Sequence, residues 1–309
     1  MSRITVLLAT YNGSKYVRQM IDSVLAQDYA DFHIVLSDDC SKDDTASILA
    51  EYAAKYPDQI THYQSGLRFG NAQNHFLHLL KTFRNAPYIM FCDQDDYWFP
   101  DKLSKTMKKM QQTEKPGVPA LVHTDLRVVD GELKLMDSSF MHFSKLNGDR
   151  LALRHLLVQN VVTGCTVMVN RELAELACAR LPENGILMHD WYLALIATAL
   201  GNIGYLDEAT IDYRQHGNNT VGAKNTRSVS YILKKIRNDG VKTAMQQTYT
   251  QAAAFLDCFG AQLDSAQREL VAAYAGMAKK GGFARRFTCL KYGFWKCGLQ
   301  RIVAQLIWG

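Results

Sequence analysis

The sequence is short of proline, long apolar runs and paired cysteines, and each shortage excludes a class of protein. Only 6 Pro and 20 Gly occur in 309 residues and 21% of the residues are charged, which excludes collagen-like, low-complexity and highly charged disordered chains. The seven cysteines are scattered and never have CxxC spacing, so neither a disulfide scaffold nor a zinc ribbon is indicated. Because 48% of the residues are hydrophobic, we expect a globular chain with a substantial core.

No segment has the length of a membrane span or the pattern of an export signal. The longest apolar stretch, from Trp191 to Leu200, is far shorter than the roughly 20 residues that a spanning helix needs. The first apolar run, Ile4 to Ala9, is too brief for the core of a signal peptide. We therefore expect a cytoplasmic protein, located at the inner face of the cell membrane if its C-terminal segment binds lipid.

Positive charge is concentrated in that C-terminal segment. Residues 279–309 hold seven Lys and Arg and no Asp or Glu, so the formal +5 of the chain minus these seven leaves −2 for residues 1–278. Aromatic residues alternate with the cations, which is typical of a segment at a membrane interface. Packing on the body or on a second subunit is the alternative, so a homo-oligomer stays open. Nucleic acid is not expected, because no nucleic-acid-binding motif is present.

The first hundred residues alternate between strand-like and helix-like hydrophobic periods. This alternation predicts a Rossmann-like α/β fold with a mostly parallel sheet, in which ligands bind at the carboxyl ends of the strands. The expected strands are 4–9, 32–36, 60–63 and 88–92, and the expected helices start near residues 17, 43 and 72.

Beyond Pro100 the pattern is mixed and then becomes wholly helical. We expect a helix over 102–112, a strand over 121–123, an apolar strand pair within 161–169, and helices over 171–180 and 190–200. After residue 226 the pattern is helical, so we divide the chain into a catalytic domain, 1–226, and a helical C-terminal region, 227–309.

Three carboxylates fall within four residues at Asp93, Asp95 and Asp96, directly after a predicted strand. Their mutual repulsion is costly unless a cation lies among them, and oxygen ligands of this kind suit Mg²⁺ or Mn²⁺. An exposed acidic turn that caps the next helix is the alternative. The sequence has no GxGxxG motif and no complete Walker loop, so a metal would have to hold the phosphates of a nucleotide ligand.

Five motifs in a fixed order carry a family resemblance. They are ATYNG at 9–13, SDDCSKDDT at 37–45, DQDD at 93–96, HDW at 189–191 and YRQHGNN at 213–219. With these motifs the chain resembles the inverting family-two nucleotide-sugar glycosyltransferases, in particular the bacterial rhamnosyltransferases. The resemblance spans roughly residues 3–225, and it implies a single nucleotide-diphosphosugar-binding domain of the GT-A type followed by a helical extension.

The resemblance also implies roles for individual residues. In the nucleotide pocket, Asp39 would accept the N3 hydrogen of a pyrimidine base and Asp93 would face the ribose. A divalent metal, Mn²⁺ or Mg²⁺, would be held by Asp95 and covered by His216, and Asp190 matches the catalytic base. The residues implied to bind the nucleotide sugar are Thr10, Tyr11, Asn12, Asp39, Asp93, Gln94 and Asp95.

Structural interpretations of the same residues remain open at this stage. Asp190 is also placed as an N-cap of the helix that starts at Trp191. The alternative interpretation of His216 is a structural or surface histidine rather than a metal ligand. Its neighbours Gly217–Asn219 suit a loop that closes over the ligand. Asp38 and Asp39 also suit a capping turn. We expect Trp98 in the core rather than as a platform for a sugar.

Together these features predict a metal-dependent, inverting glycosyltransferase. The resemblance implies transfer of a sugar, L-rhamnose from dTDP-rhamnose, to a hydroxyl of a glycan or lipid-linked glycan acceptor in bacterial surface-polysaccharide biosynthesis. A catalytically silent nucleotide-sugar-binding scaffold is the alternative. Joint presence of Asp95, Asp190 and His216 favours the enzyme, since a scaffold needs no base.

Overall fold

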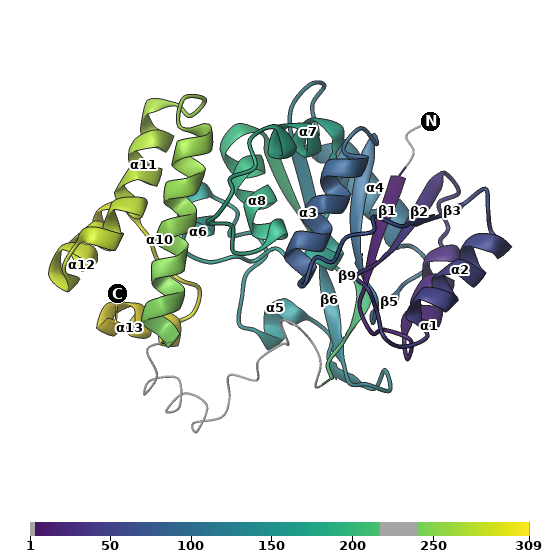
Figure 1. The fold of residues 1–309 in the computed structure, drawn as a ribbon. Helices are drawn as coiled ribbons and strands as arrows, with labels where there is room; N and C mark the ends of the chain where they lie inside the picture. The colour runs from purple at the N-terminus through teal and green to yellow at the C-terminus, as the bar shows by residue number, and fades with distance from the viewer. Residues whose placement is uncertain (1–3, 217–239, 309) are drawn as a thin grey trace.

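The computed structural model describes residues 4–216 and 240–308, and a large mixed sheet forms its centre (Figure 1). The strands are β1 (Ile4–Thr10), β2 (Phe32–Asp38), β3 (Ile60–Tyr63), β4 (Tyr88–Asp93), β5 (Tyr97–Trp98), β6 (Ala120–Val129), β7 (Leu135–Asp137), β8 (Met168–Asn170) and β9 (Asn202–Arg214).

The strand order is β3-β2-β1-β4-β8-β6-β9-β5, with β7 paired to β6. β3, β2, β1 and β4 run parallel, as do β6 and β9, whereas β8 is antiparallel to both of its neighbours. Thr10 is in register with Asp38, and Ala9 with Asp93. The polar residues that follow β1, β2 and β4 therefore meet at one edge of the sheet, as the alternation predicts.

Helices cover both faces of the sheet. The helical elements are α1 (Val17–Leu25), α2 (Thr45–Lys55), α3 (Ala72–Phe83), α4 (Lys102–Thr113), α5 (Phe140–Phe143), α6 (Leu153–Leu156), the 3-10 turn η1 (Gly164–Thr166), α7 (Arg171–Ala179), α8 (His189–Leu200), α10 (Gly240–Phe259), α11 (Ser265–Ala275), the 3-10 turn η2 (Gly276–Lys279), α12 (Gly282–Tyr292) and α13 (Leu299–Trp308). None of the helices within the described ranges is both long and apolar enough to cross a bilayer.

Each face of the sheet has its own core, because successive strand residues point to opposite sides. Val6 and Leu8 pack with α1, α2 and α4, whereas Leu7 packs with α3, α7 and α8. Trp98 is 1% exposed within the first of these cores, so the prediction that it is a core residue is confirmed. Burial on both faces explains why these strands are apolar along their whole length.

Side chains at the N-termini of three helices fix where those helices start. The Asn71 side chain accepts a hydrogen bond from the Asn74 N–H at the start of α3. The Asn170 side chain accepts one from the Leu173 N–H at the start of α7. Asp264 makes a capping box at the start of α11. Such caps supply partners for N–H groups that the first helical turn leaves unpaired. The start of α3 matters most here, because Asn71 also lines the cavity described below.

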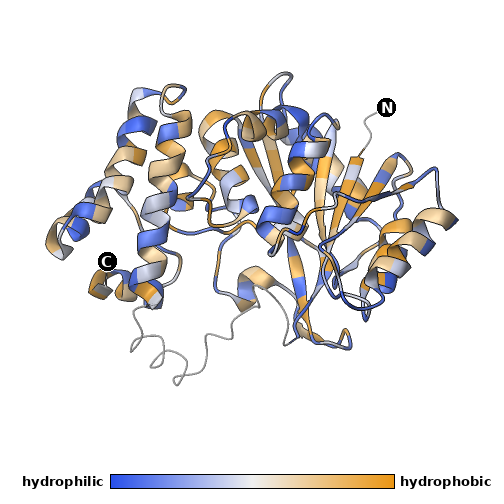
Figure 2. Cartoon of the chain, viewed as in Figure 1, coloured by the Kyte–Doolittle hydropathy of each residue, from blue (hydrophilic) through white to orange (hydrophobic). Residues whose placement is uncertain are grey.

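The C-terminal helices share the core of the α8 side (Figures 1 and 2). Phe259 of α10 lies 6.2 Å from Tyr192 of α8, centroid to centroid, and Gln251 accepts the N–H of Leu187. Phe294, in the basic segment, is fully buried against Tyr274. The boundary expected near residue 226 falls outside the described residues.

One sequence expectation about strands is wrong, and one strand was not predicted. Residues 161–167, expected within a strand pair, form a loop and η1, and their valines are buried without strand pairing. β9, for which the sequence analysis predicts no element, is a 13-residue strand parallel to β6. Gly204 within β9 allows α4 to approach closely, since a Cβ there would lie 2.5 Å from Oγ1 of Thr113. That glycine and the acidic residues Asp207 and Glu208 hide the alternating pattern.

Candidate active site

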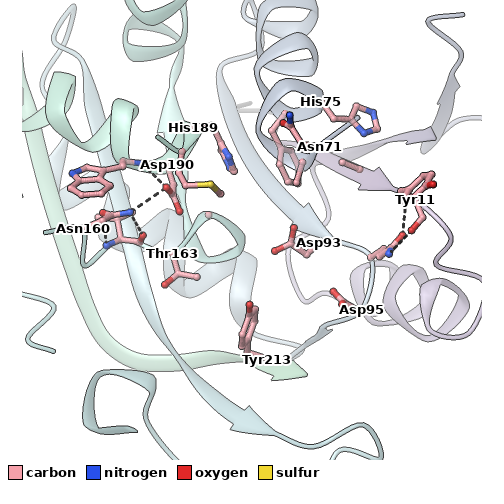
Figure 3. A pocket seen from close by; sticks show the side chains of 18 of the residues that line it. Tyr11, Asn71, His75, Asp93, Asp95, Asn160, Thr163, His189, Asp190 and Tyr213 are labelled. Atoms are coloured by element: carbon pink, nitrogen blue, oxygen red, sulfur yellow. Dashed lines mark hydrogen bonds between the residues drawn. The ribbon is translucent and has the colours of Figure 1, made fainter. Parts of the chain in front are cut away.

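A cavity of about 570 Å³ opens at the carboxyl edge of the sheet (Figure 3). Its walls come from the ends of β1, β2 and β4, the start of α3, the loop before η1, the start of α8, and β9. Of the site residues expected from the sequence, those that line the cavity are Thr10, Tyr11, Asp39, Asp93, Gln94, Asp95 and Asp190.

The loop after β1 is held by a side chain from the acidic motif. The Tyr11 N–H donates to Oε1 of Gln94 at 2.8 Å, and Nε2 of Gln94 donates to the Tyr11 carbonyl at 3.0 Å (Figure 3). A Cβ at Gly13 would lie 2.1 Å from Gln94 Oε1, so glycine is required for this approach. Gln94 thereby joins the end of β4 to the end of β1, and both residues remain at the cavity wall.

Thr10 and Asn12 connect the same loop to the end of β2. The Thr10 hydroxyl donates to the Ser37 carbonyl at 3.1 Å. Asn12, with φ 49°, donates its N–H to Oγ of Ser41 and accepts the Lys42 N–H on its side-chain oxygen. Its side chain thus supports a neighbouring loop, and Asn12 is not among the residues that line the cavity.

Asp39 anchors the loop that precedes α3. Its carboxylate accepts the backbone N–H groups of Phe69 and Gly70, the latter at 2.8 Å, and the residue is 4% exposed. The Phe69 ring stacks on His75 with 4.5 Å between ring centroids. Burial lowers the pKa of His75 to about 4, and its Nε2 lies 2.7 Å from the Ser37 hydroxyl. Asp39 is therefore the link between β2 and one wall of the cavity, and it does not cap α2, whose N-cap position is Asp44.

The three acidic residues after β4 have different environments. Asp93 and Asp95 line the cavity, whereas Asp96 is fully buried and accepts the Arg214 N–H at 3.3 Å. Burial raises the pKa of Asp93, and the nearby charges of Asp95 and Asp190 raise it further. The pKa of Asp96 is also raised, first by burial and then by Asp95 and Asp93. An exposed acidic turn is therefore the wrong interpretation of this motif.

Two of the expected metal ligands are in contact. Nε2 of His216 lies 2.6 Å from Oδ2 of Asp95, and both side chains are mostly buried. The ring of His216 packs beside Tyr16 at 5.2 Å. Possible ligand atoms of Asp93, Asp96 and Cys165 also lie within 4.8 Å of one another, a grouping that the sequence does not indicate. The proposed closing loop Gly217–Asn219 lies outside the described residues.

Arg214 supports this arrangement, although the sequence analysis assigns it no role beyond its place in a motif. Its guanidinium donates to the carbonyls of Asp95 and Gly131, both at 2.8 Å, and to the side-chain oxygen of Gln19 at 2.7 Å. It also lies 4.5 Å from the centre of the Tyr16 ring. Arg214, which is two residues before His216 in the chain, thus fixes the backbone of Asp95.

Asp190 is buried in the first turn of α8, on another wall of the cavity. It is 7% exposed, and its Oδ1 accepts the Trp191 N–H at 2.5 Å and a side-chain N–H of Asn160 at 3.2 Å. Burial raises its pKa to about 7. The N-cap of α8 is Met188, so the capping interpretation of Asp190 is wrong.

Asp190 and the acidic pair face the same cavity from different elements, as Figure 3 shows with Asp190 on one side and Asp93 and Asp95 on the other. A buried carboxyl with a pKa near neutrality suits a general base. A Cβ at Gly164 would lie 2.8 Å from Nε2 of His189, so glycine lets η1 approach the start of α8 next to Asp190. The arrangement can accept a proton at one wall and hold an anion through a cation at the other.

Several cavity residues were missed by the sequence analysis. Thr163 lies in the segment expected within a strand pair and Asn160 directly precedes it, so neither polar side chain indicated a site. His75 was read as part of a helix without a role, and Tyr213 only as part of a motif. Their position depends on the three-dimensional meeting of α3, β9 and the 160–164 loop.

Comparison with known proteins identifies the family of the chain. A family model described as "Glycosyl transferase family 2" matches residues 5–176. The dTDP-rhamnosyl transferase RfbG of Shigella flexneri is 29% identical over 246 residues, covering 72% of this chain and 76% of that protein. An uncharacterized glycosyltransferase of Nostoc is 28% identical over 233 residues, covering 73% of this chain and 69% of the relative.

Solved structures show the same fold at low identity. TarS of S. aureus, solved with UDP-GlcNAc, superposes with a TM-score of 0.56 at 16% identity, over 90% of this chain and 71% of that one. A mannosyltransferase from Pyrobaculum calidifontis, solved with GDP-Man and Mn²⁺, gives a TM-score of 0.54 at 18% identity, over 98% and 84%. The fold is of the GT-A type, as the sequence predicts, and the resemblance to a rhamnosyltransferase is confirmed at the level of homology. Since the family model covers more than half of the residues, the chain belongs to glycosyl transferase family 2.

Proposed function

We propose that this chain transfers L-rhamnose from dTDP-rhamnose, with inversion, to a hydroxyl of a lipid-linked glycan in the assembly of a bacterial surface polysaccharide. The observation that carries the proposal is the buried Asp190 carboxyl, with its raised pKa, in the same cavity as Asp93 and Asp95. A nucleotide-sugar-binding scaffold needs an anchor for the donor but no buried base. The choice of donor rests on the rhamnosyltransferase relative.

Asp190 is the base in this proposal. Its carboxylate accepts the proton of the acceptor hydroxyl while that oxygen attacks the anomeric carbon. The bond between the anomeric carbon and the diphosphate oxygen breaks, and the nucleoside diphosphate leaves with the bonding electrons. Attack from the face opposite to the leaving group inverts the anomeric centre. The Asn160 side chain orients Asp190 through the N–H that it donates to Oδ1.

The residues at the other wall fit a divalent cation. Burial and neighbouring negative charge raise the pKa of Asp93 and Asp96, so a bound cation would relieve the repulsion among the carboxylates of this motif. We propose that Asp95 and His216 hold Mn²⁺ or Mg²⁺ there, with Asp93 close by. When bound, the metal would neutralise negative charge on the diphosphate of the donor. Arg214 keeps Asp95 in place through the Asp95 carbonyl.

The nucleotide occupies the β1–β2 side of the cavity in this proposal. Thr10, Tyr11 and Asp39 form that wall together with Gly70, and Asp39 is the carboxylate available to a pyrimidine N–H. Gln94 acts by holding the Tyr11 backbone. Asn12 contributes through the loop that it shares with Ser41 and Lys42 rather than through a contact with the ligand.

A panel of nucleotide sugars tests the function directly. The protein is incubated with dTDP-, UDP- and GDP-linked sugars and Mn²⁺, and binding and slow hydrolysis are measured for each donor. We expect dTDP-rhamnose to bind more tightly and to be hydrolysed faster than the other nucleotide sugars. Binding of dTDP-rhamnose without any hydrolysis or transfer would favour the scaffold, and preference for another donor would overturn the choice of rhamnose.

A further inference from the structure

The described part of the chain exposes its large apolar side chains unevenly. Eleven are exposed there, and six of them lie on the two C-terminal helices: Phe283, Phe287, Leu290, Leu299, Val303 and Ile307. Phe283 is 84% exposed and Leu299 is 77% exposed. Exposed apolar side chains gathered in one region mark an interaction surface rather than ordinary scatter.

Their spacing puts them in stripes along each helix. Three of the side chains recur at intervals of four and three residues on α12, and the other three at intervals of four on α13, which is the spacing of one helical face. The two helices are neighbours, because Nε of Arg286 on α12 donates to the Leu306 carbonyl on α13 at 2.7 Å. We call these two stripes the α12–α13 surface; Figure 2 shows the helices that carry it at one end of the molecule.

The segment that carries this surface has cations but no acids of its own. Residues 279–309 contain seven cations and no acid. Arg285 and Arg301 donate to backbone carbonyls, which leaves their charge in place. The acid bound to this group is Glu269 of α11, which pairs with Lys291 at 3.6 Å. An anionic partner is therefore the complementary one, and a two-fold contact between copies would bring like charges together.

Other residues of the same segment hold it on the body. Phe294 is fully buried in the core, and the Arg150 guanidinium donates to the Trp295 carbonyl at 2.6 Å. The buried Gln305 side chain donates to the Phe294 carbonyl at 2.6 Å. The segment thus has both core and exposed residues, so packing on the body holds for part of it, and membrane contact stays a prediction. Its exposed apolar groups are presented on a fixed scaffold.

That scaffold contacts residues adjacent in the chain to the wall of the cavity that holds Asp190. Arg301 donates to the carbonyls of Ser144 and Lys145, the residues just before Leu146, which lines the cavity. The Cys297 N–H donates to the side chain of Gln159 at 2.7 Å, next to Asn160, which binds Asp190. Contacts of the C-terminal segment thus lie one residue away from two residues of the cavity wall.

We propose that the α12–α13 surface docks on an anionic lipid leaflet, with its apolar side chains inserted at the headgroup level and the exposed cations Lys279, Arg286 and Lys291 near the lipid phosphates. This deepens the proposed function, on which it rests for the substrate: an enzyme seated on the leaflet meets a lipid-linked acceptor at the surface where that acceptor resides. Two apolar stripes flanked by cations have the composition of an interfacial helix, and apolar burial and charge attraction both contribute to the binding.

Point variants of exposed residues test the surface without disturbing the core. The full chain is compared with a variant of α12, Phe283→Ser, Phe287→Ser and Leu290→Ser. The matched control changes three exposed apolar residues elsewhere, Leu135→Ser, Met136→Ser and Leu181→Ser. Co-sedimentation is measured with phosphatidylglycerol/phosphatidylcholine vesicles and with phosphatidylcholine vesicles, at low and high salt.

Wild type and control should bind the anionic vesicles, bind phosphatidylcholine weakly, and lose binding as salt rises. The α12 variant should partition at least about tenfold less, because three apolar side chains no longer enter the headgroup layer. Equal binding of all three proteins, or no vesicle binding by wild type, would overturn the proposal. A dimer of wild type that the α12 variant loses, without vesicle binding, would overturn it in favour of a contact between copies.

The measurement is independent of sugar transfer. Vesicle binding needs no donor, and nucleotide-diphosphate binding by calorimetry should be the same in all three proteins. Failure of the donor panel with vesicle binding intact would count against the proposed substrate alone. Failure of vesicle binding with the donor panel intact would count against the α12–α13 surface alone.

Discussion

Nε2 of His216 lies 2.6 Å from Oδ2 of Asp95, although 121 positions separate the two residues in the chain. The histidine follows the carboxyl end of β9, and the aspartate lies in the turn after β4. Arg214 joins the two segments by donating to the Asp95 carbonyl. The proposed metal site therefore depends on the pairing of β9 within the sheet, and the following predictions test it and the proposed base.

Replacing Asp95 by alanine should abolish metal-dependent binding of the nucleoside diphosphate. The metal would lose a ligand that lies beside His216, and without the metal the diphosphate would have no positive counter-charge. Isothermal calorimetry with dTDP and Mn²⁺, with and without EDTA, measures the effect. The control is Asp101→Ala, a surface carboxylate that pairs with Lys105. Undiminished affinity in EDTA or in the Asp95 variant would refute the metal assignment.

Asp190→Asn should reduce sugar transfer by about 100-fold or more while donor affinity stays nearly unchanged, since the amide cannot accept the acceptor proton. Initial rates and dTDP-rhamnose affinity are measured side by side. Asp257→Asn, an exposed carboxylate on α10, is the matched control and should behave as wild type. A wild-type rate for Asp190→Asn would mean that another group is the base.

The transfer rate should rise with pH through about 7, since burial raises the pKa of Asp190 to about that value and only the carboxylate form accepts a proton. Below that pH the rate should fall roughly tenfold per pH unit. A pH profile of kcat under saturating donor and acceptor measures this. A rate that does not change between pH 5 and 8 would contradict the assignment of Asp190 as the base.

Asp190→Asn should also change how stability depends on pH. The pKa of Asp190 is higher in the folded chain than in the unfolded one, so the wild type loses stability as pH rises from the unfolded value near 4 to the folded value near 7. The asparagine variant avoids that loss and should be more stable than wild type at pH 8, by on the order of 2–4 kcal/mol. Urea unfolding at pH 4 and pH 8 measures the difference, which should nearly vanish at pH 4.

Arg214→Met should destabilise the fold by on the order of 2–4 kcal/mol, because three acceptors would lose a buried charged donor. It should also weaken Mn²⁺-dependent dTDP binding, since the Asp95 backbone is no longer fixed. Arg18→Met is the control: its pair with Glu51 is exposed and should contribute little. Unchanged stability in urea would show that Arg214 does not fix this turn.

The order of strands and helices in the first hundred residues follows from the sequence itself. Apolar runs such as Ile4–Ala9 and helical patterns such as that after Val17 depend on local periodicity, and burial on both faces of the sheet makes the strand signal continuous. The carboxyl-edge position of Asp39 and Asp93 followed from the same alternation, because parallel strands end at one edge.

The tertiary structure decided what each polar residue contacts. Asn12 was expected in the nucleotide pocket, but it supports the loop at Ser41 and Lys42. Asp96 is turned into the core, while Asp95 next to it reaches the cavity. Such differences depend on long-range packing, which local patterns do not encode.

Residues 279–309 give a second example of this division. Their charge and aromatic content were readable from composition alone, yet Phe294 became core while Phe283 became exposed surface. Composition can be counted along the chain, whereas the burial of a side chain depends on which residues surround it in space. The sequence by itself therefore determined the fold class, the family motifs and the excess of positive charge, and only the tertiary structure decided which of those side chains meet at the cavity and which face outward.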